Sequence, residues 1–221
     1  MEKPRKNDNR FTTLVASWVG TALLAGPASA GIINTTGAFV EISPPGSVEL
    51  GALESNTEIF AFAEMLGVWL EGDLPVDITS PGVYASADDL TPGLIFPKMP
   101  VDIYFLHSDP VGSDTVTLLG SITFDQDILG IIVLSAGLDA TDATLGYPGT
   151  VYATGLSGRG LDFAGSNFDI LTLSEDRRTI TVDWRTGTKV DHIRIITAVP
   201  GPGGLALLAL AGLVGARRRR R

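Results

Sequence analysis

Two pairs of aspartates are the residues whose type and spacing best suit metal binding. They lie in the stretches FDQDILG and LDATDATLG, as Asp125, Asp127, Asp139 and Asp142. Calcium prefers six to eight oxygen ligands, which loop carboxylates and carbonyl groups can supply. Neither stretch has EF-hand spacing, and aspartate is also common in turns and at helix starts, where its side chain accepts hydrogen bonds from backbone N–H groups. We favour the turn and cap interpretation, without a cofactor, and keep a weak calcium site as the alternative.

Few other residues suit catalysis. The chain has no cysteine and only two histidines, which excludes thiol chemistry and cysteine-based zinc sites. His107 ends a predicted strand and Asp109 lies two residues beyond it, but no Gly-x-Ser-x-Gly turn supplies a nucleophile. Glycosidases use paired carboxylates, and an acidic chain offers many pairs, such as those among Glu64, Glu71 and Asp73. We expect a protein that is not an enzyme, with a polysaccharide-active enzyme as the alternative.

Aromatic side chains are the remaining candidates for binding, because aromatic rings can stack on sugars. Trp69 and Trp184 lie in predicted strands, so we expect both in the core. Tyr147 and Tyr152 flank a Pro-Gly turn and are better placed for an exposed contact. We expect Arg159, in a glycine-rich loop, to pair with a carboxylate such as that of Asp162 or with a loop carbonyl.

The elements that must position these residues are short strands. Most alternate apolar with polar residues and are separated by turns containing proline and glycine. The ten predicted strands are 37–43, 57–65, 67–72, 74–79, 101–107, 115–124, 130–137, 168–174, 179–184 and 191–197. Only 135–146 suits a short helix, and RTGT at 185–188 suggests a hairpin. We predict an all-β fold: one β-sandwich domain, jelly-roll-like, over residues 31–198.

The N-terminal 30 residues have the order of a secretory signal peptide. Four basic residues precede the uncharged run from Phe11 to Gly26, and small residues then occupy Ala28 and Ala30. We predict cleavage after Ala30, so that the exported chain begins at Gly31. An uncleaved N-terminal anchor is the alternative, because the run is close to the shortest that can span a bilayer.

Residues 199–221 combine a turn, an apolar stretch and a basic end. Gly203 to Ala216 contains only Gly, Ala, Leu and Val, and the chain closes with Arg217, Arg218, Arg219, Arg220 and Arg221. As a helix this stretch is about 21 Å long, short of the ~30 Å hydrocarbon core, although arginine side chains can reach toward the headgroups. The positive-inside rule places the arginines in the cytoplasm. We expect a transmembrane helix that holds the protein temporarily.

This tail resembles the tripartite sorting signal of PEP-CTERM proteins. The motif of that family usually reads Val-Pro-Glu-Pro, and here it is Val199, Pro200, Gly201 and Pro202. The resemblance implies bacterial export, two partners (the secretion machinery and an exosortase-type membrane peptidase), and association with extracellular polysaccharide. Gly203 and Gly204 are also similar to the GlyGly-CTERM signal, which a rhomboid-type protease processes. If the tail is not processed, the alternative is a permanently tail-anchored periplasmic protein.

The domain between the two ends of the chain is strongly acidic. The chain has 16 basic and 25 acidic residues; without the leader and the terminal arginines, 7 basic and 23 acidic residues remain. Such acidity argues against nucleic acid as a partner. Residues 116–197 resemble an uncharacterised domain found in front of PEP-CTERM tails. We expect a structural or binding protein of the cell surface or biofilm matrix, in the cell envelope or outside the cell.

Overall fold

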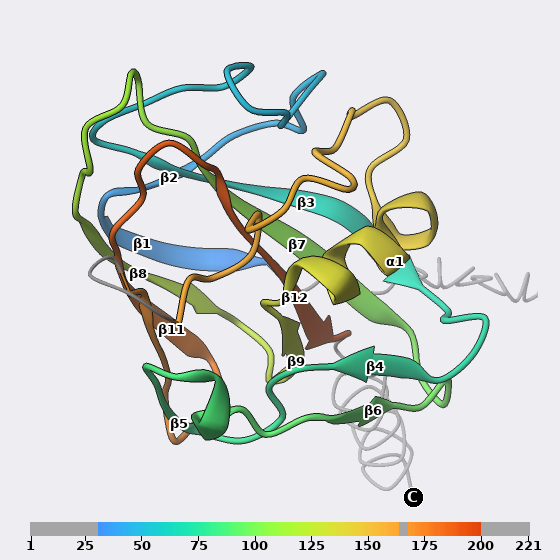
Figure 1. The fold of residues 1–221 in the computed structure, drawn as a ribbon. Helices are drawn as coiled ribbons and strands as arrows, with labels where there is room; N and C mark the ends of the chain where they lie inside the picture. Colours follow the sequence, from blue (N-terminus) through green and yellow to red (C-terminus); the bar gives the residue numbers. More distant parts are fainter. Residues whose placement is uncertain (1–30, 164–167, 200–221) are drawn as a thin grey trace, which may run out of the picture.

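Two five-stranded sheets pack face to face, and one short helix covers the outer face of the second sheet (Figure 1). A computed structural model describes residues 31–163 and 168–199. The first sheet has the order β1 (Ile32–Gly37), β8 (Leu118–Phe124), β11 (Thr179–Trp184), β10 (Ile170–Leu173) and β5 (Gly82–Tyr84). The second has the order β2 (Phe39–Glu41), β3 (Ile59–Val68), β7 (Val101–Ser108), β12 (Asp191–Ala198) and β9 (Ile128–Ile132). The predicted β-sandwich is confirmed at this level.

Smaller elements flank the two sheets. β4 (Leu74–Val76) pairs with β6 (Gly93–Ile95), and a single 3-10 turn spans Ala87–Asp89. The helix α1 (Ser135–Leu145) confirms the helix predicted at 135–146. In the described part of the chain, no helix is long and apolar enough to cross a membrane. The predicted leader and most of the sorting signal (Ala28, Ala30, Pro200, Gly201, Pro202 and the five terminal arginines) lie outside the described residues.

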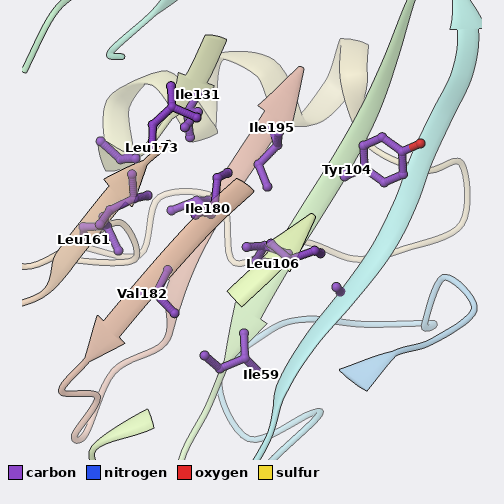
Figure 2. Packing of buried hydrophobic residues seen from close by; sticks show 14 of the residues in the cluster. Ile59, Tyr104, Leu106, Ile131, Leu161, Leu173, Ile180, Val182 and Ile195 are labelled. Atoms are coloured by element: carbon purple, nitrogen blue, oxygen red, sulfur yellow. The ribbon is translucent and has the colours of Figure 1, made fainter. Parts of the chain in front are cut away.

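The main core lies between the sheets. In β11 the alternation predicted from the sequence is confirmed, because Ile180, Val182 and Trp184 are all fully buried on the inner face. They meet apolar side chains of the second sheet, including Leu106 and Ile195 (Figure 2). Burial of these side chains contributes about 1.5–3 kcal/mol each, which allows a domain without disulfides to remain folded.

β7 and β12 are buried on both faces, although the alternation in β12 had suggested one buried face. Ile193 and Ile195 face the first sheet, whereas Ile196 joins a second apolar cluster beneath α1. The same outer face carries Arg194, which is fully buried. A charged residue in a strand therefore does not mark the solvent side here, because a further layer of chain covers it.

Two local predictions are wrong. The RTGT segment is not a hairpin within one sheet, because it lies between β11 of the first sheet and β12 of the second. The aspartates of α1 do not cap the helix: its N-cap is Leu134, which makes no side-chain cap hydrogen bond. Asp139 and Asp142 lie within the helix and bind an arginine instead.

Candidate functional site: an open hollow and the buried network behind it

A hollow of about 530 Å³ opens between the end of β3 and the end of α1. Its walls come from the segment 65–74 and from the last turn of the helix, Ala143, Thr144 and Leu145. Its volume lies within the range of small-molecule sites in proteins. This is the concave surface of the described residues that we take as the candidate site.

Trp69 gives the hollow its chemical character. Its side chain is 64% exposed, so the prediction that it packs in the core is wrong. It follows β3 directly, in the link to β4, and Gly67 near the end of β3 has a positive φ of 65° that favours glycine. Trp184, by contrast, is fully buried as predicted.

Two carboxylates line the same hollow. Glu71 and Asp73 are exposed residues of the turn between β3 and β4. An exposed indole beside carboxylates offers a flat apolar surface together with hydrogen-bond acceptors. This combination suits a ligand that has an apolar face and hydroxyl groups.

The helical wall of the hollow is held in place by buried arginines. Arg194 of β12 binds Glu64 of β3 through two hydrogen bonds, at 2.6 and 2.8 Å. The same guanidinium donates to Thr141 at 2.5 Å and to Asp142 at 3.1 Å, both on α1. Burial lowers the pKa of Arg194, but Glu64 and Asp142 more than compensate and raise it, so it stays charged. This ion pair fixes the helix to the sheet.

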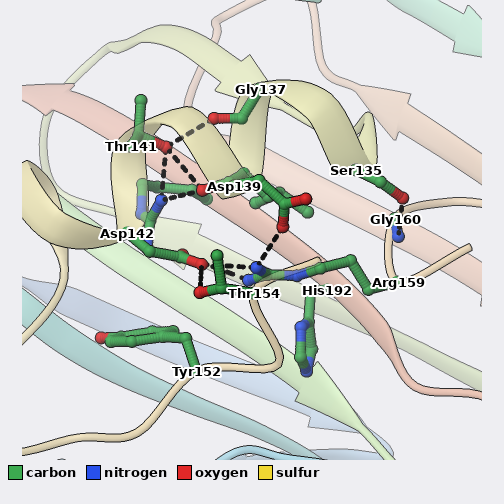
Figure 3. Close-up of polar contacts among 12 residues, drawn as sticks. Ser135, Gly137, Asp139, Thr141, Asp142, Tyr152, Thr154, Arg159, Gly160 and His192 are labelled. Atoms are coloured by element: carbon green, nitrogen blue, oxygen red, sulfur yellow. Dashed lines mark hydrogen bonds and ion pairs between the residues drawn. The ribbon is translucent and has the colours of Figure 1, made fainter. Parts of the chain in front are cut away.

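A second arginine, Arg159, reaches α1 from the loop between α1 and β10 (Figure 3). Arg159 contacts Asp142 at 2.5 and 3.2 Å and Asp139 at 2.8 Å, and Thr154 also donates to Asp142. Burial raises the pKa of the Asp142 carboxyl, but the bonds from Arg159 and Thr154 outweigh it and lower the pKa below its usual value. The prediction that Arg159 pairs with a carboxylate is confirmed, but its partners are Asp142 and Asp139 and not Asp162.

Each of the predicted calcium ligands has another partner in the described structure. Asp139 and Asp142 are neutralised by Arg159, and Asp142 also by Arg194. Asp125 accepts a hydrogen bond from the Gly31 nitrogen, a backbone role of the kind expected, whereas Asp127 pairs with Arg178 at the surface. Among residues 31–163 and 168–199 no three acidic or histidine side chains are grouped to hold a metal ion. The calcium site stays a prediction.

The two histidines meet behind the network, 85 residues apart in sequence. His107 Nδ1 lies 2.7 Å from His192 Nε2, and His107 Nε2 lies 3.0 Å from the Leu53 carbonyl oxygen. Because a carbonyl only accepts, His107 carries its proton on Nε2, and its Nδ1 accepts from His192. The Nδ1 of His192 is buried without a hydrogen-bond partner in the described structure. Burial lowers the pKa of His107 to about 4, and burial with the neighbouring positive charges lowers that of His192 as well.

Asp109 and the two tyrosines are the remaining residues considered for catalysis or binding. Asp109 accepts a hydrogen bond from the Gly51 nitrogen at 2.6 Å and is not bonded to His107. Tyr147 is 41% exposed, in keeping with the prediction. Tyr152 is only partly exposed: its ring packs against Phe105, and its hydroxyl accepts from the Tyr147 nitrogen. The sequence did not predict the hollow. The one local signal was the pair of glycines, Gly67 and Gly72, on either side of Trp69, which indicates a break in the strand.

Comparison with known proteins adds no assignment: no protein family, curated protein or solved structure matches this chain.

Proposed function

We propose that this protein is an exported, non-catalytic component of the bacterial cell surface or extracellular matrix that binds polysaccharide at the hollow beside Trp69. The exposed indole on a concave surface carries the proposal. An exposed indole that lines a concave surface suits a binding site, because its burial is favourable when a ligand covers it.

The chemistry of the hollow favours a neutral sugar. An indole can cover the C–H face of a sugar ring, while Glu71 and Asp73 accept hydrogen bonds from its hydroxyl groups. Residues 31–198 contain 23 acidic and 7 basic residues, and this negative charge repels an anionic polysaccharide. We therefore expect unsubstituted glucan-type polymers to bind better than sulfated or uronic acid polymers.

Export and processing support the extracellular location. The secretion machinery delivers the chain through a signal peptide cleaved after Ala30, and the tail from Val199 holds it in the inner membrane until an exosortase-type peptidase removes the tail. We further propose a jelly-roll connection, since the steps from β8 to β9 and from β11 to β12 each cross between the sheets.

A polysaccharide-active enzyme is the second candidate, because Glu71 and Asp73 line one hollow. Glycosidases need one carboxyl group whose pKa is raised by an apolar environment. Both side chains belong to exposed residues, which favours binding over catalysis. A permanently anchored periplasmic protein is the outcome if the tail is retained.

Binding is tested with the secreted protein recovered from its host, on a panel of neutral and acidic polysaccharides. Trp69→Ala should weaken binding about tenfold or more without changing stability. Val83→Ala removes part of an exposed apolar side chain of the first sheet that does not line the hollow, and is the matched control. Equal binding by both variants would overturn the Trp69 site, and release of reducing ends that Glu71→Gln abolishes would favour the enzyme.

Processing is tested by the intact mass of the same protein. The proposal requires a chain that begins at Gly31 and ends near Pro200. A mass that retains Arg221 would contradict processing and leave an anchored protein.

A further inference from the structure

The chain leaves the sandwich at the same end as the hollow. Ala198, the last residue of β12, pairs with Val101 of β7, and Val101 also pairs with Val68 of β3. These residues therefore lie in one row across three neighbouring strands, so Val68 and Ala198 are about 10 Å apart. Trp69 follows Val68 directly, and Val199 follows Ala198. In Figure 1 the arrowheads of β3 and β12 both point toward the lower right.

Large apolar side chains are exposed at this end. Leu66 and Trp69 flank the end of β3, and their exposed fractions are 48% and 64%. Phe96 and Met99, with exposed fractions of 49% and 45%, lie in the link from β6 to β7. Because β7 pairs with β3 and β6 pairs with β4, the links 69–73 and 96–100 are neighbours. Four large, exposed apolar residues thus lie in or beside two neighbouring links, at the end where the chain departs.

We propose that this end of the domain, which we call the apolar end (Leu66, Trp69, Phe96 and Met99), rests on the membrane surface while the tail holds the protein there. The inference rests on the membrane tether of the proposed function. Only four residues separate Ala198 from the apolar stretch that begins at Gly203, and four residues span at most about 14 Å. The tether is therefore too short to keep this end away from the bilayer.

The charges at the apolar end specify the kind of lipid surface. Tryptophan favours the headgroup region of a bilayer, and phenylalanine inserts at the boundary between headgroups and acyl chains. The Lys98 ammonium lies 5.2 Å from the centre of the Phe96 ring and can reach lipid phosphates. Glu71 and Asp73 are repelled by anionic headgroups, so the contact should be strongest on zwitterionic lipid and insensitive to salt. While the protein is tethered, the membrane covers the hollow, and sugar binding follows release.

Fluorescence of the chain from Gly31 to Arg221, which keeps the tail but lacks the leader and its Trp18, tests the contact. The chain is inserted into phosphatidylcholine vesicles with or without brominated acyl chains, and insertion is measured by flotation of the vesicles. Brominated lipid should quench the emission of Trp69, and Trp69→Phe should lose that quenching because Trp184 is buried in the core. Phe96→Ser with Met99→Ser should lose most of it, since both side chains anchor the same end.

The matched control changes two exposed apolar residues of the first sheet, Val83→Ser with Leu119→Ser, and should leave the quenching intact. A chain that floats with its vesicles but shows no quenching of Trp69 overturns the contact and leaves the tether standing. A chain that does not float overturns the tether and the contact together.

Discussion

Arg194 and Glu64, 130 residues apart in sequence, form a two-point ion pair that has no exposure to solvent. The pair joins β12 to β3, and through Thr141 and Asp142 it also reaches α1. Breaking a buried pair leaves one charge without compensation, which costs far more than breaking an exposed pair. Of the two arginines that bind α1, Arg194 is therefore the one that ties the helical wall of the hollow to β3.

Arg194→Met should lower the free energy of unfolding by about 3–5 kcal/mol, because Glu64 and Asp142 lose their shared cation. Arg178→Met breaks the exposed pair with Asp127 and should cost less than about 1 kcal/mol. Urea unfolding of both variants measures the difference. Similar losses in the two variants would show that the buried pair has no special role.

The histidine pair should make stability fall in acid. Both pKa values lie below the ordinary 6.5, so below pH 6.5 the unfolded chain binds protons that the folded protein refuses. The loss begins near pH 6.5 and continues down to about pH 4 for His107, where it amounts to about 3 kcal/mol. Urea unfolding at pH 7 and pH 4.5 measures it. In His107→Leu the slope should flatten; an unchanged slope would assign the effect to other groups.

Asp191 and Asp169 act in the opposite direction. Burial raises the pKa of Asp169 to about 6, and burial together with Asp169 raises that of Asp191. The folded protein thus holds these protons more tightly than the unfolded chain, and stability falls as the pH rises through this range. Asp191→Asn keeps an acceptor for Thr186 and should stabilise the protein at pH 7 by about 1 kcal/mol.

The exposed change Asp114→Asn is the control for this variant and should have no effect on stability. Thermal unfolding at pH 7 compares the two. Destabilisation by Asp191→Asn would mean that the charged form of Asp191 is the one the fold needs.

Gly160 should tolerate no side chain. A Cβ at this position would lie 2.1 Å from the Val133 carbonyl oxygen and 2.9 Å from the Ser135 nitrogen, and both are backbone atoms. Gly160→Ala should therefore destabilise the protein by about 1–3 kcal/mol, because the loop that carries Arg159 must shift away from α1. At Gly46 an added Cβ meets nothing within 4 Å, so Gly46→Ala should be nearly neutral. Equal unfolding midpoints would contradict the packing described.

Cleavage after Ala30 would place a charged amino group beside a carboxylate. The Gly31 nitrogen lies 2.8 Å from Asp125, so the α-amino group of the processed protein should have a pKa above the ordinary 7.7–8.0. Asp125→Asn should return the pKa of this amino group to that range, and Asp127→Asn should not. The pH dependence of α-amine labelling measures both, and identical labelling profiles would argue that the mature chain does not begin at Gly31.

Periodicity in the sequence identified most strands of the core, but it missed β1 (Ile32–Gly37) and predicted a strand over 67–72, where β3 ends at Val68. In 179–184 the apolar residues recur every second position, and such a strand can bury only one face without a polar cost, so its inner face follows directly. The segment 135–146 lacks this period of two and forms α1. The basic leader and the apolar, arginine-ended tail are likewise sequence properties, since membrane insertion responds to local hydropathy and charge.

Only the tertiary structure decided which polar residues are buried and which aromatic residue is exposed. Arg194 occupies one of the polar positions of β12, yet α1 and the loop that carries Arg159 cover that face of the strand. Its partner Glu64 is 130 residues away in the sequence. No local pattern encodes a pairing over that distance. Tryptophan is a residue type that is usually buried, but Trp69 follows the end of β3, where no second layer of chain covers it. Burial depends on what packs from elsewhere in the chain, and that is a property of the whole fold.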